Sequence, residues 1–150
     1  MMDRRLIQDT LSMLRQQIDS DTAIRLADDV HLLERLAAVV EKTGLHRHRK
    51  LTILGGYLLL QQAVLRHQDA QDGRNDTLTR GILDGDYLMG AYYKLLSQHK
   101  ELDLLSHLAP VYKKLQLSLL MGRPARRAMR EVYAAFRQYL DRADQEAMTS

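Results

Sequence analysis

The chain has 150 residues, with 22 Lys and Arg against 19 Asp and Glu, a formal charge of +3, and 45% of its residues are apolar. A chain of this length suits one domain, because it buries roughly 70% of its unfolded surface on folding, so we take residues 1–150 as a single domain. The absence of cysteine excludes disulfides, cysteine-ligated zinc and a thiol nucleophile. A surplus of +3 permits an anionic partner without requiring one.

No targeting or membrane segment is predicted. The first residues lead into an amphipathic stretch and not into a continuous apolar leader. The most apolar stretch, residues 51–65, is interrupted by glycines and glutamines and is shorter than the roughly 20 residues that a membrane span needs. We therefore expect a cytoplasmic protein with no transmembrane segment, and we interpret this stretch as a buried core helix.

Apolar residues recur at helical spacing along nearly the whole chain, and no segment alternates with a period of two. This pattern predicts an all-α fold, a single bundle of about six helices. In chain order, the helices are expected over residues 4–18, from 20–22 to 44, 48–68, 81–98, 101–121 and 125–145.

Local signals mark the ends of these helices. Residues 20–22 (SDT) offer N-caps for the second helix, and Gly44 is a plausible C-cap. The polar segment 69–79 is predicted to be the longest loop. Pro110 should kink or break the fifth helix, because it lacks an N–H group and its ring crowds the preceding turn. Residues 122–124 separate the fifth helix from the sixth.

The fourth helix has no clear polar face. Residues 82–96 contain only three charges, which point in well-separated directions, and a helix that is apolar all round is normally surrounded. Gly85 and Gly90 would let another backbone approach closely. Two interpretations remain open, a central helix of the bundle and a helix that also contacts a second subunit, for which Tyr87, Tyr92 and Tyr93 would be suitable anchors.

Enzymatic motifs are scarce. The six histidines are scattered, and the basic run 46–50 is typical of a solvated patch. His67, Asp69 and Asp72 are of metal-ligand type, but their spacing does not place all three on one helical face, which favours a polar helix end. No GxSxG, phosphate loop, HExxH or glycine-rich dinucleotide fingerprint occurs. We predict no catalytic residue and no metal site on this chain.

A basic run opens the sixth helix. Arg123, Arg127 and Arg130 share one helical side, which could contact phosphates. Apolar residues at helical spacing follow, as in an ordinary amphipathic helix with a solvated basic face. We therefore expect no nucleic-acid partner, and keep as the alternative function a helical-bundle regulator or adaptor that binds nucleic acid through this run.

The run Gly81–Leu88 (GILDGDYL), continuing through Ala91–Ser97 (AYYKLLS), resembles the GDYL…YYxLLS region of component 1 of heptaprenyl diphosphate synthase. That protein is the small subunit of bacterial two-component polyprenyl (hexaprenyl or heptaprenyl) diphosphate synthases. Upstream, Leu59–Asp72 (LLQQAVLRHQDAQD) lies where catalytic trans-prenyltransferases carry an apolar helix ending in HDDxxD. The similarity covers about residues 50–120 and implies a bundle related to part of the trans-prenyltransferase fold.

The departures from the catalytic pattern concern magnesium. Elongation ionises an allylic diphosphate, whose charge is neutralised by Mg²⁺ held on two aspartate-rich motifs. Here the first motif is degraded to Gln68, Asp69 and Asp72, with an amide in place of the first carboxylate, and no second DDxxD occurs. The chain is also about half the length of a catalytic subunit. The resemblance therefore implies a chain that is inactive alone.

The resemblance further implies a catalytic partner that forms a heterodimer or heterotetramer with this chain and carries both motifs and the magnesium. That partner would condense isopentenyl diphosphate onto a farnesyl-type primer, and the small subunit would support activity and help to set product length. The product would become a menaquinone side chain. On this reading no cofactor binds this chain, and the residues predicted to contact the partner are Tyr87, Leu88, Ala91, Tyr92 and Leu95.

Overall fold

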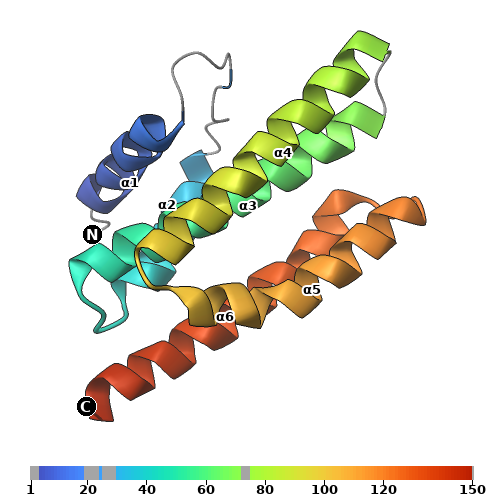
Figure 1. The fold of residues 1–150 in the computed structure, drawn as a ribbon. Coiled ribbons are helices and arrows are strands. Elements are labelled where there is room, and N and C mark those ends of the chain that lie inside the picture. Colours follow the sequence, from blue (N-terminus) through green and yellow to red (C-terminus); the bar gives the residue numbers. More distant parts are fainter. Residues whose placement is uncertain (1–3, 19–23, 25–29, 72–74, 150) are drawn as a thin grey trace.

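The computed structural model describes residues 4–18, 24, 30–71 and 75–149. Within these ranges the chain forms α-helices and no strand, so the all-α prediction is confirmed (Figure 1). The helices are α1 (Arg4–Gln17), α2 (Val30–Glu41), α3 (Arg47–Gln71), α4 (Asn75–Gln98), α5 (Leu102–Leu120) and α6 (Ala125–Thr149).

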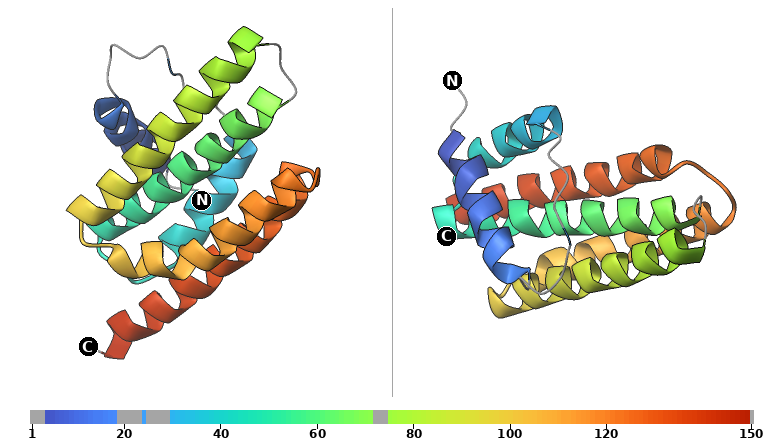
Figure 2. Two further views of the ribbon diagram at one scale, coloured as in Figure 1. Left: turned by 45° about the vertical axis from the view of Figure 1, so that its right-hand side comes forward. Right: turned by 90° about the horizontal axis from the view of Figure 1, so that it is seen from above.

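Helix α3 is the centre of the bundle. Residues 52–60 are all buried, and α3 packs against α1, α2, α4 and α6. A helix without a polar face needs neighbours on every side, and Figure 2 shows α2 and α6 on one side of α3 with α4 and α5 on the other. The predicted core helix is therefore confirmed.

Two antiparallel helix pairs, α3–α4 and α5–α6, form most of the molecule (Figure 1). The turn between them ends α4 with Lys100 in the left-handed region at φ 62°. There the Glu101 N–H donates to the Leu96 carbonyl at 2.8 Å, and the Lys100 N–H donates to the Ser97 carbonyl at 3.2 Å. This is the Schellman pattern, which satisfies the last carbonyls of the helix. The same pattern ends α5 at Gly122, which has φ 81°.

The predicted loop over residues 69–79 is wrong for most of its length. Helix α3 continues to Gln71 and α4 begins at Asn75. The far ends of these two helices project beyond the neighbouring helices (Figure 1). The polarity of this segment therefore did not mark an absence of helix.

Pro110 and Gly44 do not have the effects on helix ends that the sequence predicted. Helix α5 is continuous through Pro110 and bends along its length without breaking. Pro110 and Ser106, one turn before it, are both exposed, so water can reach the carbonyl that loses its partner. Gly44 does not cap α2 through a left-handed conformation, and its N–H donates to Asp144 Oδ1 on α6 at 2.7 Å. The N-cap candidates at residues 20–22 lie outside the described residues.

Candidate functional site: a groove beside the α3–α4 pair

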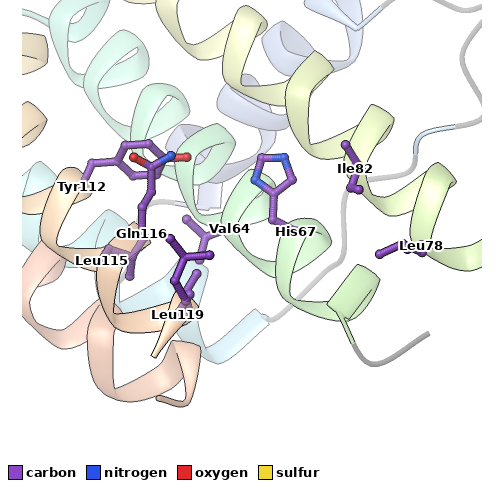
Figure 3. A pocket seen from close by; sticks show the side chains of 9 residues that line it. Val64, His67, Leu78, Ile82, Tyr112, Leu115, Gln116 and Leu119 are labelled. Carbon is purple, nitrogen blue, oxygen red and sulfur yellow. The ribbon is translucent and has the colours of Figure 1, made fainter. Parts of the chain in front are cut away.

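A groove of about 280 Å³ lies between the α3–α4 pair and α5 (Figure 3). We call it the hairpin groove. Three helices contribute side chains to it, and most of these are apolar. The lining residues are Val64 and His67 of α3, Leu78 and Ile82 of α4, and Tyr112, Leu115, Gln116, Leu119 and Leu120 of α5.

The imidazole of His67 lies in this groove and bridges to the next helix. Its Nε2 is 3.0 Å from Oδ1 of Asp86, whose side chain is mostly exposed. A Cβ atom at Gly85 would overlap the imidazole, so glycine is what lets the ring lie against α4. The close approach predicted at Gly85 thus comes from a side chain and not from a second backbone. Gly90 is exposed and has no neighbour within 4 Å of a Cβ position.

The opposite wall carries one more polar pair. Burial raises the pKa of Tyr112, and the nearby Tyr93 and Asp86 add to the rise, while a hydrogen bond with Gln116 lowers the pKa. The phenol is therefore neutral at pH 7 and available as a hydrogen-bond donor. With few polar atoms in a largely apolar wall, the groove is suited to receive apolar side chains.

Helices α4 and α5, which contribute most of the groove's lining, also carry exposed apolar residues. Leu83 of α4 is 62% exposed, and Leu120 and Met121 at the end of α5 are 78% and 72% exposed. Ile82 and Leu117 are also exposed. Scattered apolar residues are ordinary on a protein surface, but exposed apolar residues that line an apolar groove, as Ile82 and Leu120 do, are typical of an interaction surface.

Four of the five residues predicted to contact a partner lie in the chain's own core. Leu88 and Leu95 are completely buried, and Tyr92 and Ala91 are at most 9% exposed. Tyr87 is half-buried. The four buried side chains cannot reach a second subunit in this packing, so their burial fits the alternative of a central bundle helix. The side of α4 that faces solvent carries Leu83, Asp86, Gly90, Tyr93 and Lys94.

The degraded aspartate motif lies at the end of α3. Gln68 is half-buried there. Asp69 belongs to α3, but its side chain, like the whole of Asp72, falls outside what the structure describes. Among the described residues, no three His, Asp or Glu side chains are arranged to hold a metal ion.

The α5 wall of the groove was not predicted from the sequence. The last turns of α5 carry more leucines than one face of the helix can bury: Leu115, Leu117, Leu119 and Leu120. Two of them, Leu117 and Leu120, are exposed. That excess was a usable signal for an unpartnered surface. Arg49 and Tyr139, which hydrogen-bond to the buried Glu101, had no comparable signal because they lie 52 and 38 residues away from it in the sequence.

No protein-family model, curated protein or solved structure matches this chain. None of the helices in the described part of the chain is long and apolar enough to cross a membrane. In the absence of a matching protein, the function of this chain has to be inferred from its own residues and from the geometry of the groove.

Proposed function

We propose that this chain is the non-catalytic small subunit of a heteromeric trans-polyprenyl diphosphate synthase, inactive alone and acting in the cytoplasm. The observation that supports the proposal is that the two sequence runs with the family resemblance lie side by side in the fold. Residues 59–71 of the first run lie on α3, and the second run, residues 81–97, lies on the adjacent helix α4. His67 and Asp86, one from each run, meet at 3.0 Å.

The chemistry of elongation assigns the catalytic groups to a partner. Ionisation of an allylic diphosphate requires Mg²⁺, which prefers several carboxylate ligands. This chain has an amide, Gln68, where the first carboxylate of the motif would be, and its Asp86 is held by His67. We therefore assign the magnesium and both aspartate-rich motifs to the catalytic subunit, and no metal ion or other cofactor to this chain.

The hairpin groove, with the exposed residues that line it, is the surface that we assign to that subunit. A specific interface buries about 1,200–2,000 Å² and places apolar side chains at its centre. Ile82 and Leu120 line the groove and are 43% and 78% exposed, so a helix of the partner can cover them. Bound there, this chain would complete the wall of the tunnel that receives the growing product and thereby help to set its length, in the synthesis of a menaquinone side chain.

A binding measurement with groove variants tests this assignment. The double variant Ile82→Glu/Leu120→Glu introduces two charges at the centre of the proposed contact. We expect it to weaken the binding of a catalytic subunit with two DDxxD motifs from the same genome by at least ~10-fold, because burying an unpaired carboxylate is costly. Calorimetric titration of the purified subunits measures the change.

The double variant Leu102→Glu/Met148→Glu is the matched control. Its two residues are 57% and 75% exposed and do not line the groove. We expect this control to change the affinity by less than ~2-fold, because surface charges away from a contact contribute little. No binding by the wild-type chain, or equal losses in the two double variants, would overturn the assignment of the groove.

A further inference from the structure

A second groove lies on the other side of α3. It has a volume of about 470 Å³ and is bordered by α3 and by α2 and α6, which Figure 2 shows on the side of α3 away from α4. Its cationic residues are Arg35 of α2 and Arg126 and Arg130 of α6. We call it the arginine groove. It shares no lining residue with the hairpin groove.

Within the part of the chain that the structure describes, the three arginines have no acidic partner. None of them takes part in an ion pair or hydrogen bond among the described residues, and no described acidic side chain lines the groove. Arg126 and Arg130 are also one turn apart on α6, where like charges repel. Arg126 lies in the first turn of α6, which contains no acidic residue, at the positive end of the helix dipole. An anion in the groove would relieve both unfavourable arrangements.

The rest of the lining is apolar and aromatic. Tyr57 is only 2% exposed, and its ring lies 6.3 Å from that of Tyr133 in an edge-on arrangement. Leu65 and Met129, both half-buried, complete the wall. Burial, with a smaller contribution from Tyr133, raises the pKa of Tyr57, so its hydroxyl group stays neutral. A free phosphate ion would leave this wall uncovered.

We propose that the arginine groove binds a single-chain amphiphile whose head is a phosphate or a carboxylate. The guanidinium groups of Arg35, Arg126 and Arg130 hold the head, since arginine binds both groups through paired hydrogen bonds. The first carbons of the chain lie against Tyr57 and Met129. The volume of about 470 Å³ falls within the range of small-molecule sites, which are mostly apolar with a few convergent polar groups.

An amphiphile site and a nucleic-acid site would engage different arginines of the basic run 123–130. A surface that binds the phosphate backbone of a nucleic acid needs a solvated stripe of cations. Arg123 and Arg127 would serve such a surface as well as Arg126 and Arg130. All four arginines of the run are exposed. Arg126 and Arg130 line the groove, and Arg123 and Arg127 do not. Double substitution of either pair therefore gives matched variants with the same net charge.

The experiment is a calorimetric titration of the full-length chain with n-decyl phosphate and with decanoate, below their micelle concentrations. We expect saturable binding of at least one of the two, the tighter one identifying the head. Arg126→Gln/Arg130→Gln should weaken it by ~10-fold or more, because each hydrogen bond to a charged group is worth about that much. Arg123→Gln/Arg127→Gln should change it by less than ~2-fold, since long-range attraction between exposed charges is screened by salt. Circular dichroism checks that both variants are folded.

Several results would overturn the proposal. These are no saturable binding by the wild-type chain, equal weakening in the two double variants, or binding of inorganic phosphate as tight as that of the amphiphile. Equally tight binding of decyltrimethylammonium would remove the role of the arginines. Displacement of the amphiphile by a short DNA duplex, with equal losses in the two variants, would assign the run to nucleic acid. The test does not involve a partner subunit, so its outcome is independent of the proposed synthase role.

Discussion

Glu101 is a buried charge at the junction of three helices. It precedes α5 and is 3% exposed. Arg49 of α3 donates to its two carboxylate oxygens at 2.6 and 3.1 Å, and the hydroxyl group of Tyr139 on α6 donates to it at 2.9 Å. The hydrogen bond to Glu101 is the main cause of the raised pKa of Arg49. A carboxylate this buried is tolerated because both its oxygens are satisfied.

Replacing Glu101 with glutamine keeps the shape and removes the charge. We expect Glu101→Gln to lower the free energy of unfolding by ~1–3 kcal/mol, the usual worth of hydrogen bonds to a charged group. Asp9→Asn is the control, because its partner Arg47 and Asp9 itself are both exposed, and such pairs contribute about 0–1 kcal/mol. Urea unfolding measures both, and a similar small loss in the two variants would contradict the role given to Glu101.

Buried tyrosines make the fold sensitive to alkali. Burial is the first cause of the raised pKa of Tyr57, Tyr92 and Tyr139. Above about pH 10 a tyrosine of the unfolded chain ionises, while these three remain neutral in the folded protein. The unfolded state then binds fewer protons, so stability is fully present below pH 10 and falls above it, by about 1.4 kcal/mol per pH unit for each such tyrosine.

Comparison of the wild-type chain with Tyr92→Phe isolates one of these groups. Urea unfolding followed between about pH 9 and pH 11 should show a fall in stability that is shallower for the variant by up to ~1.4 kcal/mol per pH unit. Tyrosine absorbance should report ionisation together with unfolding. Parallel slopes for the two proteins would mean that Tyr92 ionises equally well in the folded chain.

At the scale of the element, the sequence predicts the positions of helices well, because helical periodicity is local. It predicts poorly which side of a helix is buried, because that depends on the neighbouring helices. Helical periodicity placed all six helices, and the largely apolar stretch 51–65 identified α3 as the core helix. The absence of a polar face on α4 did not reveal which side is covered. Leu88 and Leu95 turned out to be inside and Leu83 outside, because the direction in which α3 lies is set by tertiary packing.

The two glycines of α4 illustrate this dependence on neighbours. Gly85→Ala should lower the free energy of unfolding by ~1–3 kcal/mol, because the new methyl group must displace the imidazole of His67 and break its hydrogen bond to Asp86. Gly90→Ala meets nothing and should raise stability by ~0.5–1 kcal/mol through helix propensity. Thermal unfolding of both variants checks the signs, and a loss of stability in Gly90→Ala would mean that its surroundings are not open.

At the scale of the whole molecule, the arrangement leaves apolar surface uncovered. The α3–α4 pair and α5 enclose the hairpin groove only in part (Figure 3), and Leu120 and Met121 beside it are largely exposed. Little of this site could be predicted, because the groove joins residues as distant as Val64 and Leu120. The partner, in contrast, was expected from local sequence alone, through the run 81–97 on α4.

In the proposed function, this chain contributes to prenyl chain elongation only as part of a pair. The direct test measures incorporation of radiolabelled isopentenyl diphosphate with farnesyl diphosphate and Mg²⁺ by this chain, by a catalytic subunit with two DDxxD motifs from the same genome, and by their mixture. Chromatography of the products gives the chain length. We predict no product from this chain alone and a longer polyprenyl product from the mixture than from the catalytic subunit. Activity of this chain by itself, or a mixture no different from the catalytic subunit in rate and product length, would contradict the account.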